Sequence, residues 1–189
     1  MKKSTKIVFT VASLMASNLV FASDASFVLK ALIGSKSLES AWDKDDEMDT
    51  IGFQMTYFPG SKPFGIALDL YGSGNEEEQG VTKSQTSVGE ANLGIRWQAE
   101  VFSNISLLPY LGAGVSLVEV EKEIKTSGVK TTYDDNGVGY WIGGGLDYAF
   151  SNSWSIGFDV HYSKVDVKIN SKELDAGGIN WALSAGYRF

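Results

Sequence analysis

Apolar residues alternate with polar or small residues at every second position through most of the sequence after residue 25. The last segment, GINWALSAGYRF at 178–189, shows the pattern plainly. A β-strand sends successive side chains to opposite faces, so the pattern predicts strands with one apolar and one polar face. Eight segments carry it, at 26–35, 48–58, 64–71, 87–98, 105–118, 139–150, 154–164 and 178–189.

The connections between these segments alternate strictly between short and long. The short ones are 59–63, 99–104 and 151–153, and the long ones are 36–47, 72–86, 119–138 and 165–177. Bacterial outer-membrane barrels have short periplasmic turns and longer extracellular loops. The sequence therefore predicts an all-β fold, an eight-stranded antiparallel up-and-down transmembrane β-barrel over residues 23–189, with both termini on the periplasmic side.

Aromatic residues, 12% of the chain, cluster around the predicted short turns, where a membrane protein has its interfacial girdle. The predicted girdle residues are Tyr57, Phe58, Phe64, Trp97, Phe102, Phe150, Trp154, Tyr187 and Phe189. The 21 glycines suit close packing inside a narrow barrel. A soluble β-sandwich is the alternative, but a sandwich has no need for a glycine-rich, charged face opposite each apolar stripe.

The edge of the membrane can be placed on one segment. On its outward parity, Val115 and Leu117 are followed by Glu119, Glu121 and Glu123. Charged side chains are costly in contact with hydrocarbon. We therefore expect the lipid-facing band to end near Leu117, and residues 118–132 to continue above the membrane as a hairpin that turns near 127–128.

The N-terminus has the layout of a secretory signal peptide. Lys2, Lys3 and Lys6 precede an apolar run at 7–20, and small residues follow. We predict cleavage after Ala22, with Ala25 as the second choice, so residues 1–22 form the signal peptide. This favours export to the outer membrane of a Gram-negative cell.

Charge and cysteine content exclude several classes of function. The net charge is −7, which disfavours a nucleic-acid partner, and the absence of cysteine excludes disulfides, thiol catalysis and cysteine metal sites. The acidic runs at 43–49, 76–78 and 134–135 could hold Ca²⁺ or bridge to lipopolysaccharide phosphates, but they match no defined calcium loop. We predict no cofactor and no metal site.

Charged residues also occur on the inward parity of the predicted strands. They are Lys30, Arg96 and Arg188, with Asp69, Glu90, Asp147 and Asp159. Side chains just fill the interior of an eight-stranded barrel, and an unpaired buried charge is expensive, so we expect these groups to neutralise one another. A narrow polar path for small molecules or ions is the functional alternative.

The C-terminal residues WALSAGYRF resemble the assembly signal of bacterial outer-membrane proteins, with a terminal aromatic and alternating apolar positions upstream. This resemblance implies that the barrel-assembly machinery binds the last strand through Phe189. More broadly, residues 139–189 resemble the end of small porin-like barrels of the OmpW and OmpX type. That resemblance implies the fold and a location in the outer membrane.

A short pattern suggests an enzyme as the alternative function. His161-Tyr162-Ser163, with Glu173 or Asp175 downstream, resembles the His-x-Ser and distant Glu of outer-membrane lipid A deacylases of the PagL type, although Lys164 stands where that family has Asn. The resemblance implies a catalytic role for His161, Ser163 and Glu173. Strand parity, however, places His161 inside the barrel, whereas a lipid substrate lies outside.

The function we predict is therefore non-enzymatic. It is a monomeric barrel in contact with membrane lipid and lipopolysaccharide, with a role in surface structure, surface interaction or limited small-molecule passage. One form of surface interaction is adhesion through the hairpin at 119–138, which offers an exposed strand edge.

Overall fold

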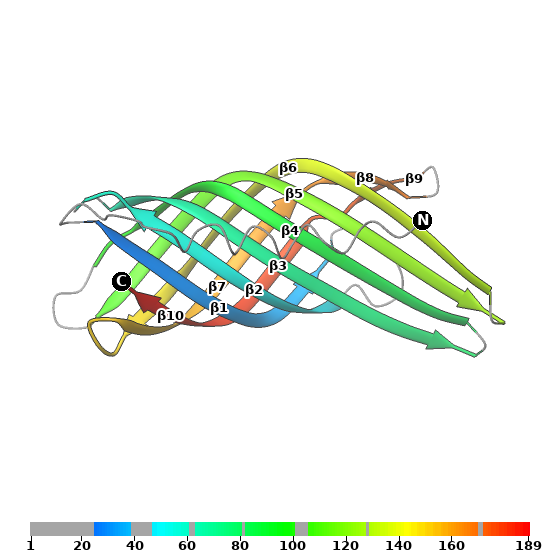
Figure 1. Cartoon of the computed structure of the whole chain (residues 1–189), viewed down its shortest axis with the longest axis horizontal. Coiled ribbons are helices and arrows are strands. Elements are labelled where there is room, and N and C mark those ends of the chain that lie inside the picture. The colour runs from blue at the N-terminus through cyan, green and yellow to red at the C-terminus, as the bar shows by residue number, and fades with distance from the viewer. Residues whose placement is uncertain are drawn as a thin grey trace.

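The computed structural model describes residues 25–38, 47–60, 63–80, 82–100, 106–127, 129–169 and 172–189. Eight antiparallel strands form a closed barrel, which confirms the predicted fold (Figure 1). They are β1 (Ser26–Ser37), β2 (Glu47–Phe58), β3 (Phe64–Gln79), β4 (Thr82–Gln98), β5 (Leu107–Thr126), β6 (Val129–Ala149), β7 (Trp154–Lys164) and β10 (Gly178–Arg188). The predicted signal peptide, 1–22, lies outside the described residues and stays a prediction.

The first and last strands of the barrel close it. β1 pairs with β10 over ten residue pairs, from Val28 with Arg188 to Ser37 with Ile179. Beyond that ladder, the backbone N–H of Phe189 donates to the carbonyl of Phe27 at 2.9 Å. Closure leaves no strand edge in the barrel wall, which is what a sheet needs when no water is available to its backbone groups.

The strands are of unequal length, so the two ends of the barrel differ. At one end, near the C-terminus, the connections β2–β3 and β6–β7 are short, and we call this the short-turn end. At the other, the hairpins β3–β4 and β5–β6 reach well beyond β1, β2 and β7 (Figure 1), and we call this the long-hairpin end. No helix among the described residues is long and apolar enough to span a membrane.

One connection predicted as a long loop consists mostly of strand instead, and another confirms a predicted hairpin. Segment 72–86 belongs to β3 and β4, which stay paired out to Gln79 with Thr82. Its residues GSGNEEE carry no apolar stripe, so the alternation that identifies a half-buried strand is missing there. The hairpin predicted to turn near 127–128 is confirmed, with Ser127 at φ 51°, the left-handed conformation that two-residue hairpin turns favour.

The connection at 165–177 contains a second, two-stranded sheet, formed by β8 (Asp166–Ile169) and β9 (Lys172–Asp175). The chain leaves the barrel wall after Lys164 and rejoins it at Gly178, whose φ is 124°. A Cβ at Gly178 would lie 2.1 Å from the carbonyl oxygen of Ser37, so both the conformation and the close approach require glycine. This small hairpin contacts β6 at the long-hairpin end.

The two faces of the wall have opposite polarity, as the alternation predicts. Large apolar side chains point outward, where Ile33 is 67% exposed and Leu183 is 61% exposed. Polar and charged side chains point inward, where Lys30 is 2% exposed and Asp69 is fully buried. A protein in water has the reverse arrangement, so the exposed apolar face requires an apolar surrounding.

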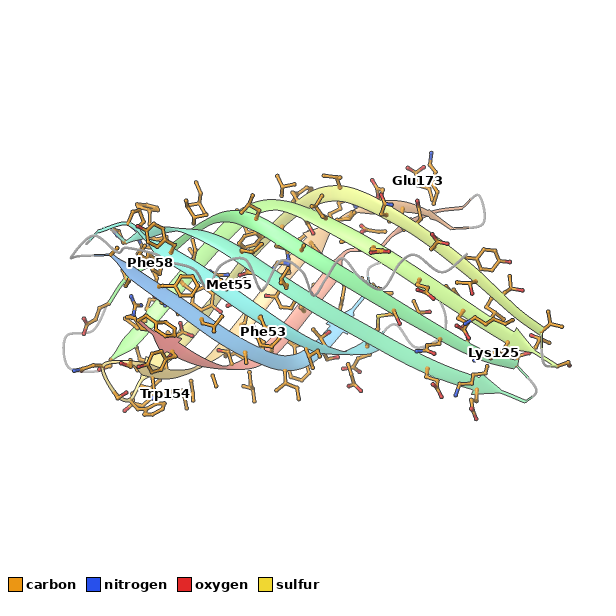
Figure 2. All side chains as sticks on the ribbon, in the orientation of Figure 1. Phe53, Met55, Phe58, Lys125, Trp154 and Glu173 are labelled. Atoms are coloured by element: carbon orange, nitrogen blue, oxygen red, sulfur yellow. The ribbon has the colours of Figure 1, made fainter. Side chains whose placement is uncertain are left out.

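An aromatic cluster follows the outer rim at the short-turn end, as predicted, although the predicted girdle residue Phe102 lies outside the described residues. Tyr187 packs edge-on against Trp154 at 4.9 Å between ring centroids and against Phe189 at 4.7 Å. Figure 2 shows Trp154 at this end of the barrel. One predicted girdle residue is wrongly placed, because Phe58 points into the barrel and is only 5% exposed. Its even position puts it on the inward parity of β2, and it packs under Arg188.

Glycines on the inward parity make room for two large rings. Trp141, which the alternation places inward, is 1% exposed, and a Cβ at Gly112 would lie 2.8 Å from its indole. Tyr110 occupies the space opposite Gly145 in the same way. The barrel interior, or lumen, is therefore filled by side chains, as expected for eight strands.

Candidate functional site

Charged side chains in the lumen form buried ion pairs. The Lys30 ammonium lies 2.6 Å from Asp147, and the Arg96 guanidinium lies 2.6 Å from Asp69. All four side chains are at most 3% exposed. The prediction that inward charges neutralise one another is confirmed for these four residues.

Asp159 is held by neutral donors. The Tyr110 hydroxyl donates to its carboxylate at 2.5 Å, and the Gln54 amide donates at 3.0 Å. Tyr71 donates to the other carboxylate oxygen at 3.4 Å. Because these donors come from β2, β3 and β5, and Asp159 lies on β7, the network ties opposite walls of the barrel together.

The densest polar cluster surrounds the carboxylate of Glu90 on β4. The Lys36 ammonium lies 2.8 Å from it, His161 Nε2 lies 2.9 Å away, and the Ser163 hydroxyl donates to it at 3.2 Å. The Asn92 amide donates to it at 2.8 Å. Glu90 thus contacts both His161 and Ser163. The sequence had placed Glu90 only among the charged residues of the lumen.

The structure places the three residues of the lipid A deacylase-like alternative in two locations. His161 and Ser163 are inside the barrel, 1% and 0% exposed, and the His161 ring stacks on Trp141 with centroids 5.3 Å apart. Glu173 lies on β9 with an exposed side chain (Figure 2). The inward orientation predicted for His161 is therefore confirmed, and the carboxylate beside both residues is Glu90.

The alternative downstream carboxylate, Asp175, has a structural role. It accepts hydrogen bonds from the backbone N–H groups of Gly177 at 2.8 Å and Val165 at 3.2 Å, and it pairs with Lys164 at 3.2 Å. These contacts hold the bend at which the small hairpin leaves the barrel wall.

Above the Glu90 cluster, the lumen becomes apolar toward the long-hairpin end. We call this group the apolar plug; its buried members are Leu38, Met48, Val88, Val118, Val120, Val165, Val167 and Ala176. Tyr133 of β6 and Leu174 of β9 pack against it. The plug fills the upper lumen, and sequence reasoning missed it because five of its eight members lie in the long connections between the predicted strands.

The long hairpins carry exposed ion pairs at their tips. Lys83 on β4 pairs with Glu76 and Glu78 of β3, and Glu123 on β5 pairs with Lys125 and with Lys130 of β6. Hydrogen bonds from Lys125 and Lys130 lower the pKa of Glu123, and the hydrogen bond to Glu76 raises the pKa of Lys83. These pairs place three carboxylates beside three ammonium groups.

The predicted acidic runs do not form a metal site among the residues that the structure describes. No group of three or more His, Asp or Glu side chains there is arranged to hold an ion. Most of the first run, 43–46, lies outside the described residues. Asp135 instead accepts a hydrogen bond from the backbone N–H of Lys168, which lowers the pKa of its carboxyl and ties β8 to β6.

Sequence and structure comparisons agree with this architecture. A family model described as "Outer membrane protein beta-barrel domain" matches residues 7–189. No curated protein matches the sequence.

Similar solved structures include three bacterial proteins, all less than 20% identical to this chain. Neisserial surface protein A (NspA) is 17% identical over 87% of this chain and 95% of its own, with a TM-score of 0.55. Ail of Yersinia pestis is 14% identical over 87% and 97%, with a TM-score of 0.57. The outer membrane protein OprG of Pseudomonas aeruginosa is 15% identical over 89% and 98%, with a TM-score of 0.60. At such identity the likeness shows the fold alone.

Proposed function

The chain belongs to the outer membrane protein beta-barrel domain family, and from this premise we propose that it is a non-enzymatic surface protein that binds partners through its long hairpins. The long-hairpin end is then extracellular and the short-turn end periplasmic. The observation that carries the proposal is the contrast between a filled lumen and a sheet that projects far beyond the wall.

The filled lumen disfavours small-molecule passage and argues for binding outside the barrel. The Lys30–Asp147 pair spans its lower part, the Arg96–Asp69 pair joins neighbouring strands there, and the Glu90 cluster and the apolar plug lie above them. A permeating solute would have to separate buried ion pairs, at a cost on the order of several kcal/mol each, and then displace the buried valines of the apolar plug. The lumen side chains therefore serve the stability of the barrel.

The projecting sheet offers a strand edge to a partner. β7 pairs with β6 only from Tyr140 onward, and β8 approaches β6 near Asp135 and Gly137. Residues 129–133 of β6 pair with β5 on one side, and no described strand pairs with the other side. An exposed edge of this kind binds extended peptide segments by adding a strand to the sheet.

The turn geometry predicts which backbone groups the edge presents. Thr126 pairs with Val129 at the end of the β5–β6 hairpin, and the closing pair of a two-residue hairpin connection exchanges both hydrogen bonds. The N–H groups of Val129, Thr131 and Tyr133 then point to β5, whereas those of Lys130 and Thr132 point to the free edge. Proline at position 132 should remove an edge donor without breaking the hairpin.

The test compares cells that display the wild-type chain with cells that display Thr132→Pro or a chain trimmed of residues 127–131. We expect both changes to reduce attachment to surfaces coated with extracellular-matrix protein and to other cells, with barrel assembly unchanged. Thr132→Val, which keeps the N–H, is the matched control. Wild-type attachment by the trimmed chain would contradict the proposal.

The alternative is a lipid A deacylase-like hydrolase that uses His161 and Ser163. Against it, both side chains are sealed in the lumen, whereas acyl chains contact the outer wall. Release of fatty acid from lipid A by the purified barrel, abolished by Ser163→Ala without loss of fold, would favour the enzyme. Appreciable single-channel conductance in planar bilayers would instead favour passage.

A further inference from the structure

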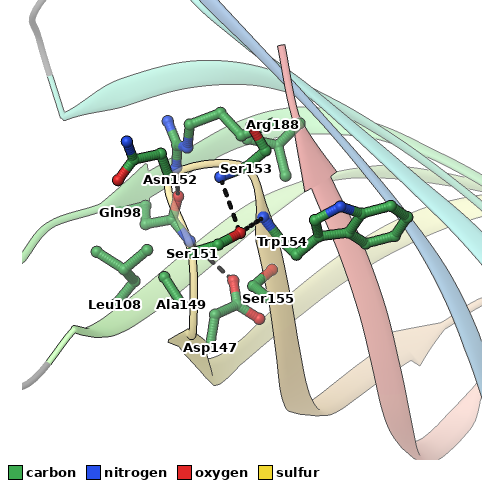
Figure 3. Close-up of a pocket in the computed structure, with 11 residues that line it drawn as sticks. Gln98, Leu108, Asp147, Ala149, Ser151, Asn152, Ser153, Trp154, Ser155 and Arg188 are labelled. Carbon is green, nitrogen blue, oxygen red and sulfur yellow. Dashed lines mark hydrogen bonds between the residues drawn. The ribbon is translucent and has the colours of Figure 1, made fainter.

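The short-turn end of the barrel opens into a cavity of about 610 Å³. We call it the periplasmic vestibule; its walls include the polar residues Gln98, Ser151 and Arg188 and the apolar residues Phe58 and Leu108. At its inner end a recess of about 20 Å³, enough for one water molecule, reaches Asp147 (Figure 3). The vestibule lies at the opposite end of the barrel from the proposed binding edge.

Arg188 differs from the other inward-facing cations. Lys30, Lys36 and Arg96 each lie within 2.8 Å of a carboxylate, whereas Arg188 has no carboxylate within ion-pair distance among the described residues. A guanidinium carries five N–H donors. Two of the donor nitrogens have acceptors, Ser26 Oγ at 2.9 Å and Gln98 Oε1 at 2.7 Å, so three N–H groups have no acceptor among the described residues.

The surroundings fix the orientation of this guanidinium. The Gln98 amide nitrogen donates to Asp147 at 2.9 Å, so its oxygen must face Arg188. The Phe58 ring lies under the guanidinium, with its centroid 5.6 Å from Cζ. A positively charged fork that is half-buried and held on three sides is pre-organised to bind an anion.

The connection between β6 and β7, which forms part of the vestibule wall, adds a further donor, the Ser151 hydroxyl. Ser151 Oγ accepts hydrogen bonds from the backbone N–H of Trp154 at 2.9 Å and of Ser153 at 3.4 Å (Figure 3). Its own hydroxyl hydrogen has no acceptor among the described residues. Among the described residues of the vestibule and its recess there are two carboxylates: Glu100 is exposed at the rim, and Asp147, at the inner end, is paired with Lys30.

From this geometry we propose that the vestibule binds a small monocarboxylate with a short apolar body. Arg188 takes the carboxylate, because its planar fork matches two carboxylate oxygens, and the apolar body lies against Phe58 and Leu108. The volume, and the mixture of an apolar wall with a few oriented polar groups, are those of a small-molecule site.

The test is a titration of the full barrel in lipid nanodiscs with hexanoate and, separately, with acetate. The measurement follows the amide NMR signals of Asn152 and Ser153. We expect saturable shifts with hexanoate, weaker binding of acetate, and at least about tenfold weaker hexanoate binding by Arg188→Gln, since a charged hydrogen-bonding partner is lost. Arg188→Lys keeps the charge but not the planar fork of donors, so its affinity for hexanoate should lie between those of the wild type and Arg188→Gln.

Lys125→Gln, which removes a cation at the far end of the barrel, is the control and should bind like the wild type. If Arg188→Gln does not fold, the exposed rim residue Asn152 gives a second test, because Asn152→Lys should strengthen and Asn152→Asp weaken hexanoate binding. Non-saturable shifts in the wild type, equal affinity for acetate and hexanoate, or wild-type affinity in Arg188→Gln would overturn the proposal. So would equal affinities of the two Asn152 variants.

Discussion

The lower part of β5, toward the short-turn end, and its upper part, toward the long-hairpin end, follow the same alternation. The polarity of the inward and outward faces is reversed between them. Up to Leu117, apolar residues such as Val115 point outward and the polar Ser116 points inward. From Val118 on, Val118 and Val120 are buried inside while Glu119 and Glu121 are exposed outside. Backbone geometry decides only that residues alternate, and the surrounding solvent decides which kind of residue belongs on which face.

The same contrast applies to ion pairs. In the lower part the Arg96–Asp69 pair is buried, and in the upper part Glu123 pairs with Lys125 and Lys130 at the surface. A buried charge that loses its partner cannot be solvated, whereas water replaces a partner lost at the surface. The difference between the two parts can therefore be tested by removing one partner of an ion pair in each part.

The largest effect should come from Asp69→Asn, which leaves the Arg96 guanidinium without a countercharge. We expect the free energy of unfolding to fall by about 3–5 kcal/mol, the usual cost of breaking a buried pair. Urea titration of the barrel in phospholipid vesicles measures it. Glu123→Gln is the matched control and should change stability very little. Similar losses in the two variants would show that the lumen is as solvated as the hairpin tip.

A smaller effect should come from a charge on the outer face. Leu93 is 58% exposed on the part of β4 toward the short-turn end. Leu93→Arg should lower the free energy of unfolding by about 2–4 kcal/mol, because the guanidinium would face hydrocarbon. Gln85 lies on the same face of the same strand, above the boundary, and Gln85→Arg should be nearly neutral. A nearly neutral Leu93→Arg would mean that lipid does not contact this face. The same titration measures both variants.

The apolar plug should respond to truncation more weakly still. Val120 is fully buried, and Val120→Ala should cost about 1–3 kcal/mol in unfolding free energy. Val138 has the same side chain but is 69% exposed on the outer face, so Val138→Ala should cost less. Hydrogen exchange of β8 and β9 amides should accelerate in the first variant and not in the second. No difference between them would contradict a packed plug.

The smallest effect should be a pH dependence of the hairpin tip. The pKa of Glu123 is lowered in the folded chain, so its ion pairs contribute stability above the ordinary value of 4.5. That contribution disappears as the pH falls through the lowered pKa. Amide shifts of residues 121–126 should therefore move below pH 4.5, and Glu123→Gln should abolish the change. A midpoint above 4.5 would contradict the assigned pairing.

Sequence reasoning predicted the barrel well because alternation is a local signal that survives wherever one face meets lipid. It located each barrel strand, the inward His161 and the turn at 127–128. It missed the outer half of β3, where Gly, Ser and Glu follow one another without an apolar stripe. The apolar plug and the contact of Glu90 with His161 depend on distances between strands, which no period along the chain reveals.

The same limit applies to the sites. Strand parity placed Arg188 inside the barrel, but whether it would have a carboxylate partner depended on the positions of Gln98 and Asp147 on other strands. Phe58 was assigned to the girdle from its position near a turn, although its parity pointed inward. Where position along the chain and parity disagree, parity was the better guide, because closure of the barrel fixes the direction of each side chain.

The most direct test of the membrane boundary uses the absence of cysteine from the chain. Single-cysteine variants at Val115, Leu117, Glu119 and Glu121 can be treated on intact cells with a membrane-impermeant maleimide. We expect labelling at 119 and 121 and protection at 115 and 117. Equal labelling at all four positions, or labelling only after the cells are broken open, would contradict a boundary at Leu117 with the long hairpins outside the cell.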